Sequence, residues 1–266
     1  MSRNGEPIST PNLAAAVLDV AARNGGVFRL DRGGATMGEL AVVGFAVEAG
    51  TVTRTMSRLV EIGRAVRVEK GAYVVADAFG RVEPFAAAPA LVDAGYLSLW
   101  AAADHYRLTT QDVAGMAVVT DRTKAEVPLI HDYVARFHTT NADRLFGFHE
   151  EPMGGTYGRI ADVEKMLIDL VWFYGQPITP DAFQVMAIWR HAFHEHRANP
   201  YVLADYAARM NSQRLARRVG YLLDAYQQPG SDLLAGWKSG DRKPITVLPG
   251  LPSGGGTLDP RWGIVA

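Results

Sequence analysis

Residues 50–77 read GTVTRTMSRLVEIGRAVRVEKGAYVVAD, and this stretch decides the fold of the N-terminal part of the chain. Its first half places four apolar residues at the spacing of one helix face, namely Val52, Met56, Leu59 and Val60. Gly63 follows where a helix favours a left-handed C-terminal cap. Apolar residues then alternate on both sides of Glu69-Lys70-Gly71, which predicts a short β-hairpin.

The opposite face of this predicted helix is polar and carries Thr53, Arg54, Ser57, Arg58 and Glu61. Upstream, the pattern predicts a helix with Leu13 and Val17 on its buried side, a short strand over 27–30, and a helix opened by a capping box of Thr36 and Glu39. The order helix, strand, helix, turn, helix, hairpin is typical of a winged helix-turn-helix. In that fold, one helix enters the DNA major groove and the hairpin rests on the backbone.

We therefore expect residues 1–80 to form a winged helix-turn-helix domain that binds double-stranded DNA. Arg54 or Arg58 would grip a guanine with two hydrogen bonds, and Thr53 and Ser57 would reach bases or phosphates. Phosphate contacts, which position the domain, would come from Arg64, Arg67 and Lys70. The alternatives for these residues are a solvated helix face or a winged domain that binds protein.

Charge and composition narrow the classes of function. The net charge of −1 argues against a nonspecific polyanion binder, yet residues 50–70 hold five cations against Glu61 and Glu69. The chain has no cysteine, which excludes disulfides and thiolate-held zinc. No apolar run approaches the length of a membrane span, and the N-terminus is a poor signal peptide. We expect a cytoplasmic protein without a membrane partner.

The rest of the chain is expected to contain a linker and a second body. Residues 81–94 are rich in Ala and Pro and predict a linker. Residues 95–266 predict a mixed α/β domain with a helical C-terminal part, so the fold class is α+β. Strands are expected at 116–119, 131–137 and 145–148, and helices at 98–108, 162–174, 181–196, 200–211 and 212–227.

Short blocks along nearly the whole chain carry a family resemblance. They are LVEIG (59–63), KGAY (70–73), YLSLWAAA (96–103), HYRLTTQ (105–111), VVT (118–120), IADVEKMLID (160–169), RLARRVGYLL (214–223) and WG (262–263). In their order and spacing the sequence resembles the AbiEi-type antitoxins, the repressor-antitoxin half of bacterial toxin–antitoxin operons. It departs from that pattern at Arg107, where relatives often carry glycine.

The resemblance implies an N-terminal domain that binds operator DNA and represses its own operon. It also implies a C-terminal domain needed to neutralise a partner toxin, which in this family is a nucleotidyltransferase-like enzyme. Two other functions stay open. The chain could be a repressor whose second body senses a small ligand, or an antitoxin that modifies its toxin enzymatically.

A second basic cluster follows Arg209 on a predicted helix. Arg214, Arg217 and Arg218 share one face by spacing, with only Asp205 nearby. We expect this face to contact an acidic partner or DNA beside the operator; the alternative is a solvated face.

Two further clusters favour structural roles. His191, His194, Glu195 and His196 lack the HExxH order of zinc proteases, so we expect a solvated or partly packed helix end and no metal. Glu164 and Asp169 diverge by about 140° around a helix. We assign Glu164 to the helix dipole and Asp169 to an exposed or arginine-paired position. The expectation is a protein without catalytic residues or cofactors.

Overall fold

The computed structural model describes residues 12–31, 35–76, 81–111, 113, 115–130, 132–176, 179–237, 243–248 and 256–265. The chain forms two compact units of mixed α and β structure, which confirms the α+β class. Unit 1 comprises residues 1–93 together with 152–158, and unit 2 comprises residues 94–151 and 159–266. In the described part of the chain, no helix is both long and apolar enough to cross a membrane.

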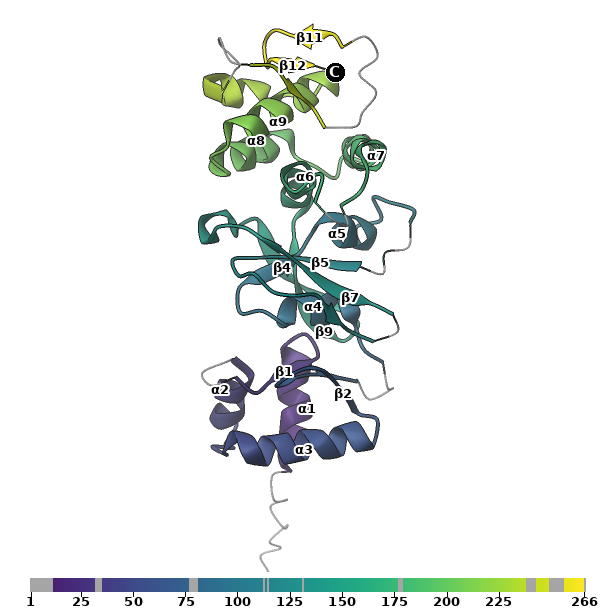
Figure 1. The fold of residues 1–266 in the computed structure, drawn as a ribbon, viewed down its shortest axis with the longest axis vertical. Helices are drawn as coiled ribbons and strands as arrows, with labels where there is room; N and C mark the ends of the chain where they lie inside the picture. The colour runs from purple at the N-terminus through teal and green to yellow at the C-terminus, as the bar shows by residue number, and fades with distance from the viewer. Residues whose placement is uncertain are drawn as a thin grey trace, which may run out of the picture. The chain divides into compact units, whose positions relative to one another are not determined.

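Unit 1 contains the elements that the sequence predicts, in the predicted order. They are α1 (Leu13–Arg23), β1 (Val27–Arg29), α2 (Ala35–Val42), α3 (Ala49–Glu61), β2 (Ala65–Glu69) and β3 (Ala72–Val75). The strands form an antiparallel sheet in the order β1-β3-β2. The hydrophobic core of unit 1 contains Val17 of α1, Met56 of α3 and Tyr73 of β3. α3 lies along one edge of the unit, across the axis of α1 (Figure 1).

The C-terminal end of α3 confirms the expectation for Gly63. This glycine has a φ of +72°, and its N–H donates to the carbonyl of Val60. The N–H of Arg64 donates back to the carbonyl of Leu59. These two bonds make a Schellman cap, which ends the helix and turns the chain directly into β2.

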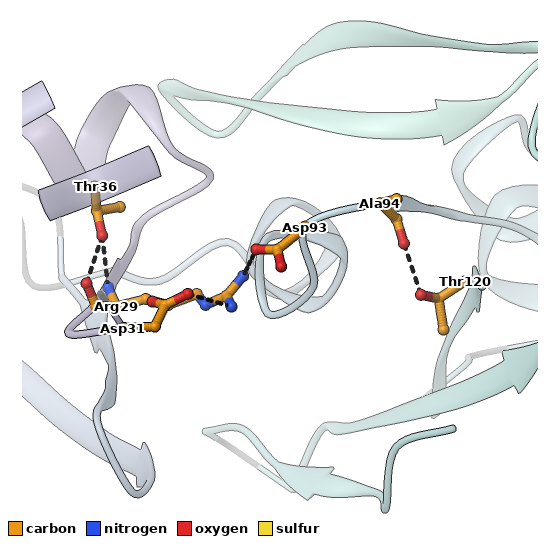
Figure 2. A network of polar contacts seen from close by, with 6 residues as sticks. All are labelled: Arg29, Asp31, Thr36, Asp93, Ala94 and Thr120. Carbon is orange, nitrogen blue, oxygen red and sulfur yellow. Dashed lines mark hydrogen bonds and ion pairs between the residues drawn. The ribbon is translucent and has the colours of Figure 1, made fainter. Parts of the chain in front are cut away.

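The capping box predicted at the start of α2 is wrong. Thr36 is buried, and its hydroxyl donates to the carbonyl of Arg29 at 2.6 Å while accepting from the Arg29 N–H at 3.0 Å (Figure 2). Glu39 accepts instead from the side-chain amide of Asn24. Thr36 therefore pairs with the backbone of β1 rather than with the first turn of its own helix.

The segment predicted as a linker, residues 81–94, contains a helix, α4 (Pro84–Ala90). Its small side chains Ala86, Ala87 and Ala88 are fully buried. They permit close approach, because a Cβ on Gly25 would lie 2.6 Å from the carbonyl oxygen of Ala86, and one on Gly158 would lie 2.9 Å from its Cα. The Ala and Pro content thus reflects tight packing rather than an extended spacer.

The strands that directly follow α4 form one sheet with both parallel and antiparallel pairs. In the order β6-β7-β5-β4-β9-β8 it contains β4 (Gly95–Leu97), β5 (Gly115–Thr120), β6 (Val127–Pro128), β7 (Val134–Thr139), β8 (Phe148–Met153) and β9 (Thr156–Ala161). The Thr120 hydroxyl on β5 donates to the carbonyl of Ala94 just before β4 (Figure 2). The tip of the β8–β9 hairpin, residues 152–158, clusters with unit 1.

The strand predictions were partly right. The strand expected at 116–119 is β5. The one expected at 131–137 is β7, which begins at Val134; His131 lies outside the described residues. The one expected at 145–148 is wrong, since this stretch follows a short 3-10 helix, η1 (Ala142–Arg144), and β8 begins only at Phe148.

The helices of unit 2 agree closely with the sequence. They are α5 (Leu99–His105), α6 (Val163–Trp172), α7 (Ala182–His194), α8 (Pro200–Arg209) and α9 (Gln213–Ala225), followed by the 3-10 helix η2 (Ser231–Trp237), and they lie together on one side of the sheet (Figure 1). Side chains of Asp162, Asp181, Asn199 and Ser212 cap four of them. Arg107 after α5 has a φ of +57°, a left-handed conformation that glycine adopts more readily than other residues.

The C-terminal strands are anchored by side chains of α9. β10 (Ile245–Thr246), β12 (Ile264–Val265) and β11 (Leu258–Asp259) form a small sheet in that order. The buried guanidinium of Arg217 donates to the carbonyls of Trp262 at 2.5 Å, Gly263 at 2.6 Å and Lys243 at 3.3 Å. Trp262 is fully buried against Gly220, where a Cβ would overlap its ring.

An ion pair is buried in unit 2. Lys165 and Asp169, one helical turn apart on α6, are both fully buried and bond each other directly. The other carboxylate oxygen of Asp169 accepts from the hydroxyls of Ser98 at 2.8 Å and Tyr96 at 3.2 Å. Burial, and then the charge of Asp169, raise the pKa of Tyr96 well above its usual value. This network ties β4 and the start of α5 to α6.

Candidate nucleic-acid interface

The face of α3 predicted to read DNA is exposed. Thr53, Arg54, Ser57 and Arg58 all face solvent, whereas Val52, Met56 and Leu59 are buried in the core of unit 1. Val60, which the spacing assigned to the buried stripe, is 38% exposed. The helix is therefore amphipathic, with its cationic side outward.

The two hydroxyl side chains on this face already use their hydrogens. Thr53 donates to the carbonyl of Ala49 at 2.8 Å, and Ser57 donates to the carbonyl of Thr53 at 3.0 Å. Each oxygen keeps lone pairs, so in this geometry it can accept from a base amino group but cannot donate to a phosphate. The hydroxyls thus suit base edges better than the backbone.

The arginines supply the donors. Arg54 makes a single bond to the hydroxyl of Thr51, at 3.2 Å. Arg58 makes none to any described residue, and no described carboxylate lies within ion-pair distance of either arginine. Both guanidinium forks can therefore present two parallel N–H groups to a guanine or a phosphate.

Arg29 on β1 shows the contrast. Its guanidinium contacts the carboxylates of Asp31 at 2.7 Å and Asp93 at 2.8 Å (Figure 2). A phosphate would have to displace two negative charges to reach it. The exposed arginines of α3, which have no described carboxylate partner, differ from Arg29 in this respect.

The hairpin after α3 turns at Lys70 and Gly71, as predicted. Lys70 is exposed at this turn, and Gly71 takes a φ of +79°. Arg67 is exposed on β2, and its Nε donates to the carbonyl of Glu69 at 3.3 Å. These two cations remain suited to phosphate contacts.

Arg64 differs from the other predicted cations. It is half-buried and lines a pocket of unit 1 together with Val75, Ala76 and Glu83. Its position just after the Schellman cap turns it toward β3 and α4 rather than fully to solvent. Arg64 is therefore less exposed than Arg67 and Lys70, the other two cations predicted to contact phosphate.

The second basic cluster does not form one exposed face. Arg217 is 4% exposed, and its donors are used by the C-terminal backbone, so its assignment to a partner-binding surface is wrong. Arg214 is exposed, and Arg218 is half-buried, with its Nε donating to the carbonyl of Thr246 at 3.1 Å. Helical spacing alone did not show that the chain after α9 returns to cover one side of this helix.

The carboxylates of α6 also have structural roles. Asp169 is buried and paired with Lys165, not exposed or paired with arginine as expected. Glu164 accepts from the N–H of Asn199 at 2.6 Å, and burial raises the pKa of its carboxyl. His191 contacts the carbonyl of Leu108, and no group of three or more His, Asp or Glu among the described residues is placed to hold a metal ion.

A pocket in unit 2 was not predicted from the sequence. It lies between α6 and α9 and includes Trp172 and Tyr174 beside Arg214 and Arg218. Aromatic residues at the end of an apolar helix resemble core residues in sequence, so no spacing signal marked them.

Comparison of the chain with models of known protein families, and with curated proteins, gave no match.

Proposed function

We propose that unit 1 is a winged helix-turn-helix that binds operator DNA, with α3 in the major groove and the β2–β3 hairpin on the sugar-phosphate backbone. The observation that carries this proposal is the exposed face of α3, where Arg54 and Arg58 stand one turn apart without a described carboxylate partner. A buried apolar face opposite them holds the helix in place. Protein-binding helices gain affinity from large exposed apolar anchors. Beside the arginines, the exposed face of α3 offers only the partly exposed Val60, at 38%, among its described residues.

The residues divide between two roles. Arg54 and Arg58 read bases, helped by the acceptor oxygens of Thr53 and Ser57. Arg67 and Lys70 contact phosphates and give affinity without sequence preference.

The wider proposal is an antitoxin that represses its own operon and neutralises a nucleotidyltransferase-like toxin, without chemistry of its own. It is supported by the resemblance to AbiEi-type antitoxins. Within unit 2, Arg214 and Arg218 remain candidates for partner contact, and Arg217 does not. Cytoplasmic location follows from this proposal, since the operator and the newly made toxin are both found there.

Fluorescence anisotropy with the full chain tests DNA binding. The probe is a duplex from the promoter upstream of the chain's own gene, and the competitor is random duplex of equal length. Arg54→Ala or Arg58→Ala should cost about 1–3 kcal/mol on the promoter and less on random DNA. Arg67→Ala or Lys70→Ala should weaken both equally and reduce the salt slope by about one.

Arg23→Ala is the matched control, because Arg23 is an exposed arginine on α1 that pairs with Asp19. It should leave both affinities unchanged. Equal losses on promoter and random DNA for the α3 variants would remove the base-reading role. An absence of DNA binding by the folded full chain would refute the proposal as a whole.

Neutralisation needs a separate test. The full chain is co-expressed with the product of the adjacent open reading frame, beside a promoter reporter. Rescue of growth by the wild type and by Arg58→Ala, with repression lost only in Arg58→Ala, is the expected result. If the neighbouring gene is not toxic, the antitoxin role is contradicted while the DNA-binding role stands.

A further inference from the structure

Unit 2 contains a pocket of about 400 Å³ between the end of α6 and the first turns of α9. Its lining is mixed aromatic, aliphatic and cationic: Val171, Trp172, Tyr174, Ser212, Arg214, Leu215 and Arg218. The volume lies in the range of sites for small molecules.

Two positive charges face this pocket without a described counter-charge. Arg214 and Arg218 are one helical turn apart, a spacing at which like charges repel. Neither forms an ion pair with a carboxylate of the described chain, and Arg214 makes no hydrogen bond there. Burial, and then the charge of Arg214, lower the pKa of Arg218. An anion between the two guanidinium groups would relieve this repulsion.

Trp172 of the aromatic wall contacts a further arginine. The guanidinium of Arg144 lies 4.5 Å from the ring centre of Trp172, and its Nε is fixed by the carbonyl of Met210 at 2.9 Å. Arg144 does not line the pocket, and its contact with the ring helps to hold Trp172 in place as the apolar wall.

The dipoles of the two helices that end at the pocket have opposite signs there, so they do not decide which ligand charge the pocket favours. Ser212 caps the N-terminus of α9, which adds about half a positive charge, whereas the end of α6 adds about half a negative one. The two full arginine charges therefore dominate. Burial, and then the negative charge of Asp181, raise the pKa of Tyr174. The Asp181 carboxylate accepts a hydrogen bond from the N–H of Gln184, at 2.8 Å, at the start of its own helix.

We propose that this pocket binds the phosphate monoester of a small organic molecule. Arg214 and Arg218 hold the phosphate oxygens, Tyr174 lines the same pocket, and Trp172 packs against the organic body. A phosphate monoester offers up to two negative charges and three acceptor oxygens, which suits two guanidinium forks better than a carboxylate does. The site lies in unit 2 and does not depend on DNA binding by unit 1.

Isothermal titration calorimetry with the full chain, at constant ionic strength in a phosphate-free buffer, tests this. The probes are adenosine monophosphate, glycerol 3-phosphate, inorganic phosphate, acetate, adenosine and hexaglutamate. At least one of the two monoesters should bind saturably and more tightly than inorganic phosphate. Acetate and adenosine should bind far more weakly.

Arg214→Gln should weaken the monoester by about tenfold to a hundredfold, because it removes a charge-assisted hydrogen-bond donor that has no described structural partner. Tyr174→Phe is the second variant, and it should weaken binding more mildly. Arg190→Gln, an exposed arginine on α7 outside the pocket lining, is the matched control and should bind as the wild type does.

Four results would overturn the proposal. The first is that neither monoester binds saturably, and the second is that adenosine binds as tightly as its monophosphate. The third is that Arg214→Gln leaves monoester binding unchanged. The fourth is that hexaglutamate binds and no monoester does. The last result would instead assign the surface to an acidic protein partner.

Discussion

The buried ion pair of α6 should be the most sensitive point of unit 2. Asp169→Asn keeps the shape of the side chain and an acceptor for the Ser98 and Tyr96 hydroxyls, but removes the carboxylate that pairs directly with the Lys165 ammonium. Breaking a buried pair from one side costs roughly 3–5 kcal/mol. Both side chains are at most 1% exposed, so solvent screening does not reduce this figure.

Lys165→Met should cost less than Asp169→Asn. The carboxylate left behind keeps two hydroxyl donors, and bonds to a charged group are worth about 1.5–3 kcal/mol each. The ammonium left by Asp169→Asn keeps the ring faces of Tyr96 and Phe146, at 5.5 and 5.2 Å, and the charge of Asp162, which does not bond it directly. In the double variant neither charge remains, so its loss should fall well below the sum of the single losses.

Urea unfolding followed by tryptophan fluorescence measures these losses. All five tryptophans of the chain, Trp100, Trp172, Trp189, Trp237 and Trp262, belong to unit 2, so the signal reports this unit. Asp205→Asn, on the exposed side of α8, is the control and should change stability by less than about 0.5 kcal/mol. A loss below about 1 kcal/mol for Asp169→Asn, or single losses that simply add, would refute the reasoning.

Three further predictions concern unit 2. Gly220→Ala should lower the melting temperature, because a Cβ at this position would overlap the Trp262 ring. Gly236→Ala should not lower it, because nothing lies within 4 Å of a Cβ there. Equal melting temperatures for the two variants would contradict this packing. Arg217→Met should speed amide hydrogen exchange in residues 256–265, which Arg214→Met should leave protected; unchanged exchange in both would show that the Arg217 bonds do not anchor the C-terminal strands. Burial lowers the pKa of His138 below its ordinary 6.5, so the unfolded chain binds a proton that the folded unit does not. Stability should therefore fall as pH drops from about 7.5 to about 5.5, and His138→Asn should flatten this slope in fluorescence-monitored melts; an identical slope would remove His138 as its source.

Local patterns predicted most elements because each is coded by neighbouring residues. The apolar stripe of α3 (apart from Val60), the glycine that ends this helix and the two-residue turn after β2 are short-range signals, and they appear in the structure. The predicted helices at 162–174 and 212–227 begin within one residue of α6 and α9, whose first turns are capped by Asp162 and Ser212. The exposed arginines of α3 were predictable for the same reason.

Long-range partners were not predictable. Thr36 looks like a helix cap in sequence, but its bonds go to the backbone of Arg29, seven residues earlier. Arg217 has the spacing of an exposed cation, yet the carbonyls that bury it come from residues more than 25 positions later. The turn of the β8–β9 hairpin, Gly154-Gly155 with φ values of +54° and +90°, was a readable signal that went unused.

Unit 1 is built from two separate segments of the chain, and this affects when it can be completed during synthesis. Residues 152–158 belong to this unit, where Thr156 donates to the carbonyl of Ala22 and Gly158 lies against Ala86. The ribosome must therefore translate residues 94–151 before the N-terminal unit has all of its parts. At typical elongation rates this adds a delay on the order of seconds. A nascent chain stalled after residue 93 would hold the complete α3 and hairpin but lack the segment that closes over α1 and α4.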